Sequence, residues 1–136
     1  MYSYRACLGQ IEFPSYYKPV VFDVGCNINE IPSHCGTLDD FTELFLSQYS
    51  KSKVYGIDPL YWQAYEDKWK DDERVSLVKK ALTDNVGTCT LYTPGSDNPI
   101  EAHAISSLYN RECFCEGIVE HKVECTTLET LFDELD

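Results

Sequence analysis

Three runs of hydrophobic residues occur between residues 20 and 82, and none alternates strictly between apolar and polar positions. They are Val20–Val24, Lys53–Asp58 and Val75–Leu82. The first leads into Asp-Val-Gly and a polar turn, and the second ends at an acidic residue before proline. Short runs of this kind, bounded by turn residues, predict strands buried on both faces, as in the middle of a parallel sheet.

Apolar residues recur at helical spacing in the two segments that separate these runs. The first predicted helix extends from about Leu38 to Ser50, after a start signal of threonine and aspartate. The second extends from Leu60 to Trp69. The order strand, helix, strand, helix, strand, joined by right-handed crossovers, predicts an α/β fold with a Rossmann-like parallel sheet.

The pattern changes after residue 82, where antiparallel strands are expected to be added to the sheet. Asn85–Gly87 predicts a turn, and Thr88–Tyr92 a short strand antiparallel to its neighbour. Further extended segments are predicted at Ala104–Tyr109 and Val119–Thr126, a terminal helix at Leu128–Leu135, and a covering segment at residues 1–19. The length of 136 residues fits one domain, residues 1–136.

The charge balance narrows the partners that we expect. The chain has 11 basic and 23 acidic residues, for a net charge of −12. Such a chain is a poor match for nucleic acid or an anionic membrane surface, because both are bound largely through Lys and Arg. There is no apolar stretch of the ~20 residues that a membrane-spanning helix needs, and the first residues lack a signal-peptide core. We therefore expect a cytoplasmic protein without a nucleic-acid or membrane partner.

Seven cysteines are scattered through the chain. Cys113, Cys115, His121 and Cys125 could in principle hold zinc, but their spacing lacks the paired knuckle of structural zinc sites. A small buried hydrophobe in a strand is the favoured interpretation of Cys125. No metal site is predicted.

Polar residues and a glycine follow the first two predicted strands. In parallel sheets ligands bind at the carboxyl ends of strands, and Gly25 would let the backbone approach a ligand flanked by Asp23 and Asn27. Asp58, at the end of the second strand, is 33 residues beyond Gly25 and stands where a nucleotide-binding fold accepts ribose hydroxyls. It could equally cap the following helix, since it precedes proline. Ala81 would lie where an adenine ring packs.

Several of these segments together resemble one protein family. Asp23-Val24-Gly25-Cys26-Asn27-Ile28-Asn29-Glu30 is similar to the D-V-G-x-N-x-G-E loop of FkbM-type methyltransferases, a branch of the class I S-adenosylmethionine (SAM) enzymes. Shorter similarities follow in the same order at Tyr55–Pro59, Val78–Asp84 with Gly87, Ser106–Leu108 and Val123–Leu131.

The resemblance implies a SAM-dependent methyltransferase, with O-methyl transfer to a small-molecule or sugar hydroxyl. By analogy Asp23, Gly25 and Asn27 would border the methionine end of the cofactor. Asp58 would bind the ribose hydroxyls, and Ala81 would lie near the adenine. The resemblance assigns no catalytic base to this chain.

Two departures from the family pattern leave other functions open. Asn29 replaces a glycine of the loop, and the sequence stops at Asp136, before the family's next core strand. We therefore expect a fold truncated relative to the full class I enzyme, and a second chain could complete the sheet beside Val20–Val24. One alternative is a non-catalytic module that binds SAM or a partner. A nicotinamide-dependent oxidoreductase is less favoured, because this loop has one glycine where pyrophosphate binding uses three.

Overall fold

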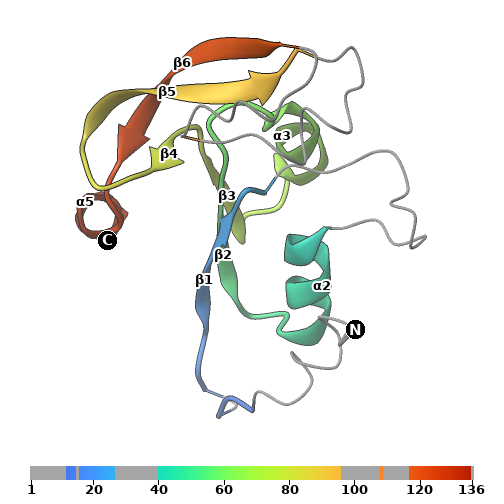
Figure 1. The fold of residues 1–136 in the computed structure, drawn as a ribbon. Coiled ribbons are helices and arrows are strands. Elements are labelled where there is room, and N and C mark those ends of the chain that lie inside the picture. Colours follow the sequence, from blue (N-terminus) through green and yellow to red (C-terminus); the bar gives the residue numbers. More distant parts are fainter. Residues whose placement is uncertain (1–11, 15, 27–39, 96–107, 109–116, 136) are drawn as a thin grey trace.

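The computed structural model describes residues 12–14, 16–26, 40–95, 108 and 117–135, and every structural statement below concerns these residues. They form an α/β structure of two three-stranded sheets and three helices (Figure 1). None of these helices has the length and apolar character needed to cross a membrane.

The first sheet is parallel, as predicted. It consists of β1 (Val20–Val24), β2 (Lys53–Ile57) and β3 (Val75–Val78), in the order β1-β2-β3. Val21 pairs with Val54 and Val54 with Val75, so these side chains share one face of the sheet. Val54, in the central strand, is fully buried.

Two helices connect these strands and cover that face. α2 (Phe41–Gln48) begins after Asp40, whose carboxylate accepts a hydrogen bond from the Glu43 amide at 3.1 Å. α3 (Gln63–Trp69) has no side-chain cap. The main core cluster joins Phe45 and Leu46 of α2 to Val54 of β2, and Trp69 of α3 packs against it.

Both helices are shorter than the sequence pattern predicts. The second begins at Gln63 instead of Leu60, because the Asp58 carboxylate holds residues 60 and 61 in a turn.

The prediction of one continuous strand over Val75–Leu82 is wrong. The chain leaves the first sheet after Val78, and β4 (Ala81–Leu82) belongs to the second sheet. Lys79 lies between them, with its ammonium 2.9 Å from Glu66 and 3.6 Å from the centre of the Trp62 ring. These contacts hold the connection against α3 at the point where the chain changes sheets.

The second sheet has the order β4-β6-β5. β5 (Gly87–Pro94) and β6 (Ile118–Thr126) are antiparallel, and β4 runs parallel to β6. The predicted strands at 88–92 and 119–126 are thus confirmed, with longer bounds. The predicted strand at 104–109 lies outside the described residues except for Leu108.

The terminal helix and the N-terminal segment pack against the first sheet. α5 (Leu128–Glu134) begins after Thr127, whose hydroxyl accepts a hydrogen bond from the Thr130 amide at 3.1 Å. Phe132 of α5 contacts Phe22 of β1 edge-to-face, with ring centroids 5.1 Å apart. In the described part of the predicted covering segment, Phe13 contacts Tyr49 at the end of α2.

Candidate functional site

The carboxyl ends of β1 and β2 lie side by side at one edge of the parallel sheet. Val24 pairs with Ile57, and the Gly25 amide donates a hydrogen bond to the Ile57 carbonyl at 2.7 Å. The Asp58 amide donates to the Val78 carbonyl at 3.1 Å, which aligns it with the end of β3. We call the polar residues and the glycine at this edge the strand-end rim: Asp23, Gly25, Cys26 and Asp58.

Asp58 is buried and stabilises the turn that follows β2. Its Oδ1 accepts hydrogen bonds from the backbone amides of Leu60 at 2.8 Å and Tyr61 at 2.7 Å. The residue is 6% exposed. The prediction that Asp58 is the N-cap of the helix is wrong, because Trp62 holds the N-cap position of α3. In the part of the chain that the structure describes, both hydrogen bonds to the Asp58 carboxylate use Oδ1.

Asp23 is turned toward the helices rather than along the strand axis. The Thr42 hydroxyl of α2 donates to Asp23 Oδ2 at 2.7 Å, and the Tyr65 hydroxyl of α3 lies 2.8 Å from the Thr42 oxygen. Because Thr42 has one hydroxyl hydrogen, already donated to Asp23, the Tyr65 hydroxyl must be the donor in the second bond. Burial raises the pKa of the Asp23 carboxyl, and the Thr42 hydrogen bond partly offsets this effect.

Tyr65 depends on a glycine in β2. A Cβ atom at Gly56 would lie 2.4 Å from Cε1 and Cζ of the Tyr65 ring, far inside van der Waals contact. Tyr65 is fully buried, and its ring therefore packs directly on the β2 backbone. Gly56, Thr42 and Tyr65 are not among the site residues predicted from the sequence. A glycine inside a predicted buried strand was the available signal, since it marks a close approach.

Gly25 and Cys26 complete the rim. Gly25 has a φ of 79°, which favours glycine, and among the described residues no atom beyond its chain neighbours lies within 4 Å of the position that a Cβ would occupy. Cys26 is 4% exposed, and burial, followed by the negative charges of Asp23 and Asp58, raises the pKa of its thiol. The thiol is therefore protonated and is not a nucleophile.

Ala81 lies in the core of the second sheet. It is 6% exposed and packs in a cluster with Leu91, Val123 and Cys125, against which Leu60 also packs. Leu60 belongs to the turn held by Asp58, so the cluster reaches this turn. Cys125 is a buried hydrophobe in a strand, as predicted.

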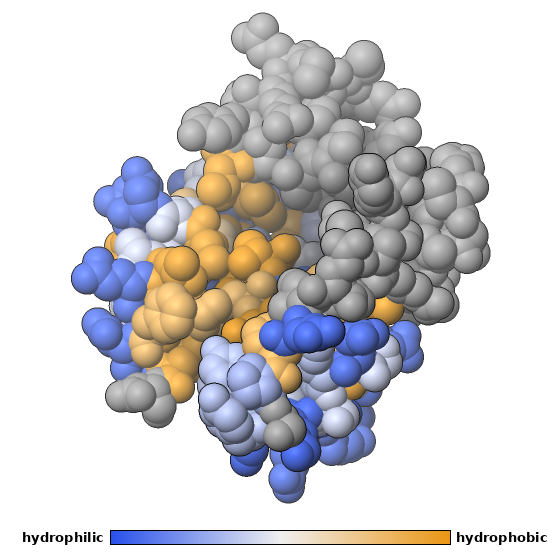
Figure 2. All heavy atoms as spheres, turned by 90° about the horizontal axis from the view of Figure 1, so that it is seen from below, coloured by the Kyte–Doolittle hydropathy of each residue, from blue (hydrophilic) through white to orange (hydrophobic). Residues whose placement is uncertain are grey.

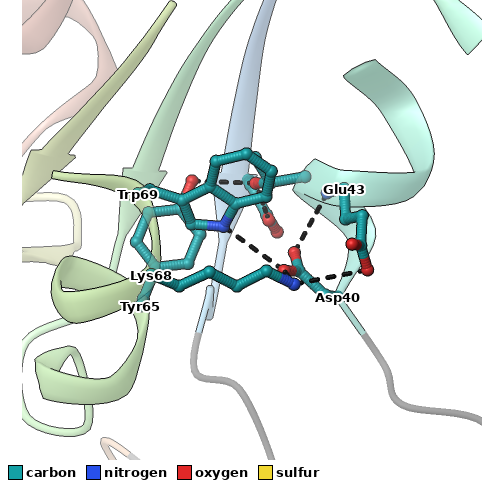
Figure 3. A network of polar contacts seen from close by, with 7 residues as sticks. Asp40, Glu43, Tyr65, Lys68 and Trp69 are labelled. Atoms are coloured by element: carbon teal, nitrogen blue, oxygen red, sulfur yellow. Dashed lines mark hydrogen bonds and ion pairs between the residues drawn. The ribbon is translucent and has the colours of Figure 1, made fainter. Parts of the chain in front are cut away.

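A second polar cluster links the two helices beside the rim (Figure 3). The Lys68 ammonium of α3 lies 2.6 Å from Asp40 and 3.3 Å from Glu43, and the Trp69 indole N–H donates to Asp40 at 3.3 Å. In Figure 3 the Tyr65 ring lies beside Trp69 on α3. Asp40 thus caps α2 and fixes α3 against it, which holds Thr42 and Tyr65 in place.

Several of the other predicted residues lie outside the described part of the chain. Asn27 and Asn29 lie outside the described residues, as do Cys113 and Cys115. His121 is hydrogen-bonded to Thr93 at 3.0 Å. In the part of the chain that the structure describes, no cluster of three or more His, Cys, Asp or Glu residues could hold a metal ion.

A surface hollow of about 410 Å³ lies elsewhere, along β5 of the second sheet. Thr83, Thr88, Cys89 and Cys125 contribute to its lining, which includes no residue of the strand-end rim. The hollow is open and shallow, and the polar groups that converge on the rim make the rim the better candidate site.

The rim combines acceptors and negative charge with an open approach at Gly25. Asp58 can accept hydrogen bonds from hydroxyl groups, and the carboxylates of Asp23 and Asp58 favour a cationic ligand. Neither Cys26 nor Tyr65 is a base at neutral pH, because burial raises the pKa of both groups.

Comparison with known proteins returned no matching protein family, no matching curated protein and no matching solved structure.

Proposed function

We propose that this chain is a SAM-dependent methyltransferase that transfers a methyl group to a hydroxyl of a small molecule or sugar. The observation that carries the proposal is the strand-end rim. Asp23, Gly25 and Asp58 lie at the adjacent ends of two parallel strands, joined by the bond from the Gly25 amide to the Ile57 carbonyl. Ligands of open parallel sheets bind at such an edge.

The chemistry of the rim fits this cofactor. SAM has a sulfonium and an ammonium group, both cationic, and a ribose with two hydroxyl donors. Asp23 and Asp58 supply negative charge close to Cys26, where both carboxylates raise the pKa of its thiol. Asp58 uses Oδ1 for its turn, which leaves Oδ2 to accept from a ribose hydroxyl.

Each rim residue then has a distinct part in binding. Gly25 admits the cofactor close to the backbone, because a side chain at this position would project into the open space beside it. Asp58 orients the ribose, and Leu60, which is partly exposed and packs against the cluster that contains the buried Ala81, offers an apolar surface to the adenine. Bound SAM supplies the transferable methyl group, and the protein contributes alignment with the acceptor.

A non-catalytic module that binds the same cofactor is the second candidate. It is favoured by the burial of Cys26 in the rim and of Tyr65 beside it, which raises the pKa of both groups and makes them poor bases. Among the described residues, neither could deprotonate an acceptor hydroxyl.

Isothermal titration calorimetry of the chain with SAM and with NAD tests the binding part of the proposal. The informative variant is Asp58→Asn, which keeps the Oδ1 acceptor for the Leu60 and Tyr61 amides but replaces Oδ2 with an amide donor. Loss of one buried hydrogen bond to a charged group should weaken SAM binding roughly 10- to 100-fold, about 1–3 kcal/mol.

Asp72→Asn is the matched control, because Asp72 pairs with Arg74 at the opposite, amino-terminal end of β3. It should leave SAM affinity unchanged. Binding of NAD but not SAM would overturn the assignment. Formation of S-adenosylhomocysteine with hydroxyl acceptors then separates an enzyme from a binding module.

A further inference from the structure

Two cysteines outside the strand-end rim lie side by side on the second sheet. In the pairing of β5 with β6, Cys89 is opposite Val123 and Cys125 is opposite Gly87, so the two cysteines are diagonal neighbours on one face. Both are free thiols, and Cys89 packs against the core cluster that contains Cys125. Figure 2 shows an apolar area on the side seen from below, but a pair of thiols offers covalent chemistry that an apolar area cannot.

The two thiols are in direct contact. Burial raises the pKa of the Cys89 thiol, a hydrogen bond with the Cys125 thiol and its charge raise it further, and the Lys122 ammonium lowers it. Opposite Cys125, Gly87 has no side chain. Among the described residues no atom beyond its chain neighbours lies within 4 Å of the position that a Cβ would occupy there. The Cys125 side chain therefore has room to turn toward Cys89.

The two thiols differ in their access to small molecules. Cys125 is 4% exposed, whereas Cys89 is half-buried. Both contribute to the lining of the open hollow of about 410 Å³ along β5. A small molecule that enters this hollow meets the Cys89 sulfur first, and the Cys125 sulfur lies behind it.

The positions of the two cysteines favour a bond that is easily reduced. Diagonal neighbours in an antiparallel pair have Cα atoms ~7–8 Å apart, which is just beyond the ~4.4–6.8 Å usual in disulfides. A bond between Cys89 and Cys125 therefore requires a small movement of the two strands and is strained. Strained disulfides are the labile and regulatory ones, in contrast to permanent structural crosslinks.

We infer that Cys89 and Cys125 form a thiol–disulfide exchange site for low-molecular-weight disulfides of the glutathione type. The Cys89 thiolate attacks one sulfur of the small disulfide, which gives a mixed disulfide on Cys89 and releases one small thiol. Cys125 then gives up its proton and attacks the Cys89 sulfur, so the Cys89–Cys125 bond forms and the second small thiol leaves. The two protein thiols lose two electrons and two protons, and the small disulfide becomes two thiols. This reaction joins β5 to β6 and is independent of the proposed cofactor site.

The test equilibrates the whole chain with mixtures of reduced and oxidised glutathione. It starts both from the reduced and from the oxidised chain, because a largely protonated thiol exchanges slowly. Acid quenching, alkylation of free thiols, trypsin digestion and mass spectrometry then locate the bonds. Trypsin cleaves after Lys and Arg, so Cys89 is the single cysteine of the peptide 81–111 and Cys125 that of the peptide 123–136. A disulfide between these two peptides identifies the pair without ambiguity.

The inference predicts that the linked peptides form from either starting state, in a fraction that follows the ratio of oxidised to reduced glutathione. Their yield should be roughly tenfold or more higher in the native chain than in urea, because the unfolded chain must close a long loop. Cys125→Ala should accumulate a mixed disulfide on Cys89, since no second thiol resolves it, and Cys89→Ala should leave Cys125 free.

Four outcomes would overturn the inference. They are equal yields in the native chain and in urea, a stable mixed disulfide on Cys89 of the parent chain, a bond from Cys89 to a different cysteine, and no linked peptides at any glutathione ratio.

Discussion

Replacing Gly56 with alanine should destabilise the fold strongly, through a clash with one side chain. The new Cβ would lie 2.4 Å from two ring carbons of Tyr65 and 2.6 Å from its hydroxyl oxygen. Since both the strand and the ring are buried, the ring has to move by about 1 Å to restore ordinary contact distances. That movement breaks the 2.8 Å hydrogen bond between the Tyr65 and Thr42 hydroxyls.

The expected loss of unfolding free energy is the sum of two contributions. Overpacking a buried site costs about 1–3 kcal/mol, and a buried hydrogen bond left unmade costs about 1–3 kcal/mol. Together they predict a loss of about 2–6 kcal/mol, which is a large part of the 5–15 kcal/mol typical of a folded domain. Urea denaturation followed by circular dichroism measures this loss directly.

A double-mutant cycle shows whether Tyr65 is the cause. Tyr65→Ala alone creates a cavity and should cost about 3–5 kcal/mol, but in its background the alanine at position 56 has room. The double variant should therefore lose less unfolding free energy than the sum of the two single losses. We expect the difference to be about 2 kcal/mol or greater. Additive losses, or a Gly56→Ala variant within about 0.5 kcal/mol of the parent, would refute the reasoning.

Three further predictions concern the neighbouring groups. The pKa of Asp23 is raised above its usual 3.8 in the folded chain, so the native state holds this proton more tightly and loses stability as pH rises through the folded pKa. Asp23→Asn, which keeps an acceptor for Thr42, should therefore gain stability relative to the parent between about pH 4 and 7, and a gain that shrinks with rising pH would contradict this. Asp40→Asn should lose mainly the ion pair with Lys68. Asp40→Ala should also lose the cap of α2, and its loss of unfolding free energy in urea denaturation should be about 0.5–2 kcal/mol larger. Equal losses for the two variants would show that the cap contributes nothing. Gly25→Ala should cost about 1–2 kcal/mol from its positive φ alone in urea denaturation. The loss should be the same in the Tyr65→Ala background, and a different loss there would show that Gly25 is coupled to Tyr65.

The sequence pattern predicts the parallel sheet well because its signals are local. Short, mostly apolar runs mark β1 and β2 up to the turn that follows each of them, and they mark the start of β3 but not its end. The helices between them follow from apolar spacing in the same way. Their starts are less predictable, because the start of α3 depends on which amides the Asp58 carboxylate binds.

The change of sheet at Lys79 could not be predicted from the apolar run alone. Residues 75–82 have the composition of one strand, and the break depends on contacts with Glu66 and Trp62 of another segment. Likewise, Asp23 was predicted at the correct edge of the sheet. Its partner Thr42 lies 19 residues away along the chain, and no local pattern specifies that pair.

The hydrogen bonds of Asp23 and Asp58 give the two carboxylates different roles at the rim. Asp23 ends a series of hydroxyl bonds from Tyr65 through Thr42, which ties α3, α2 and β1 together. A ligand that displaced the Thr42 hydroxyl from Asp23 Oδ2 would leave this buried hydroxyl without its acceptor, at a cost of about 1–3 kcal/mol. Asp58 needs one oxygen for its turn and can offer the other at no such cost. If SAM binds at this edge, Asp58 should therefore make the direct contact, while Asp23 acts through its charge and through the position that it gives to β1.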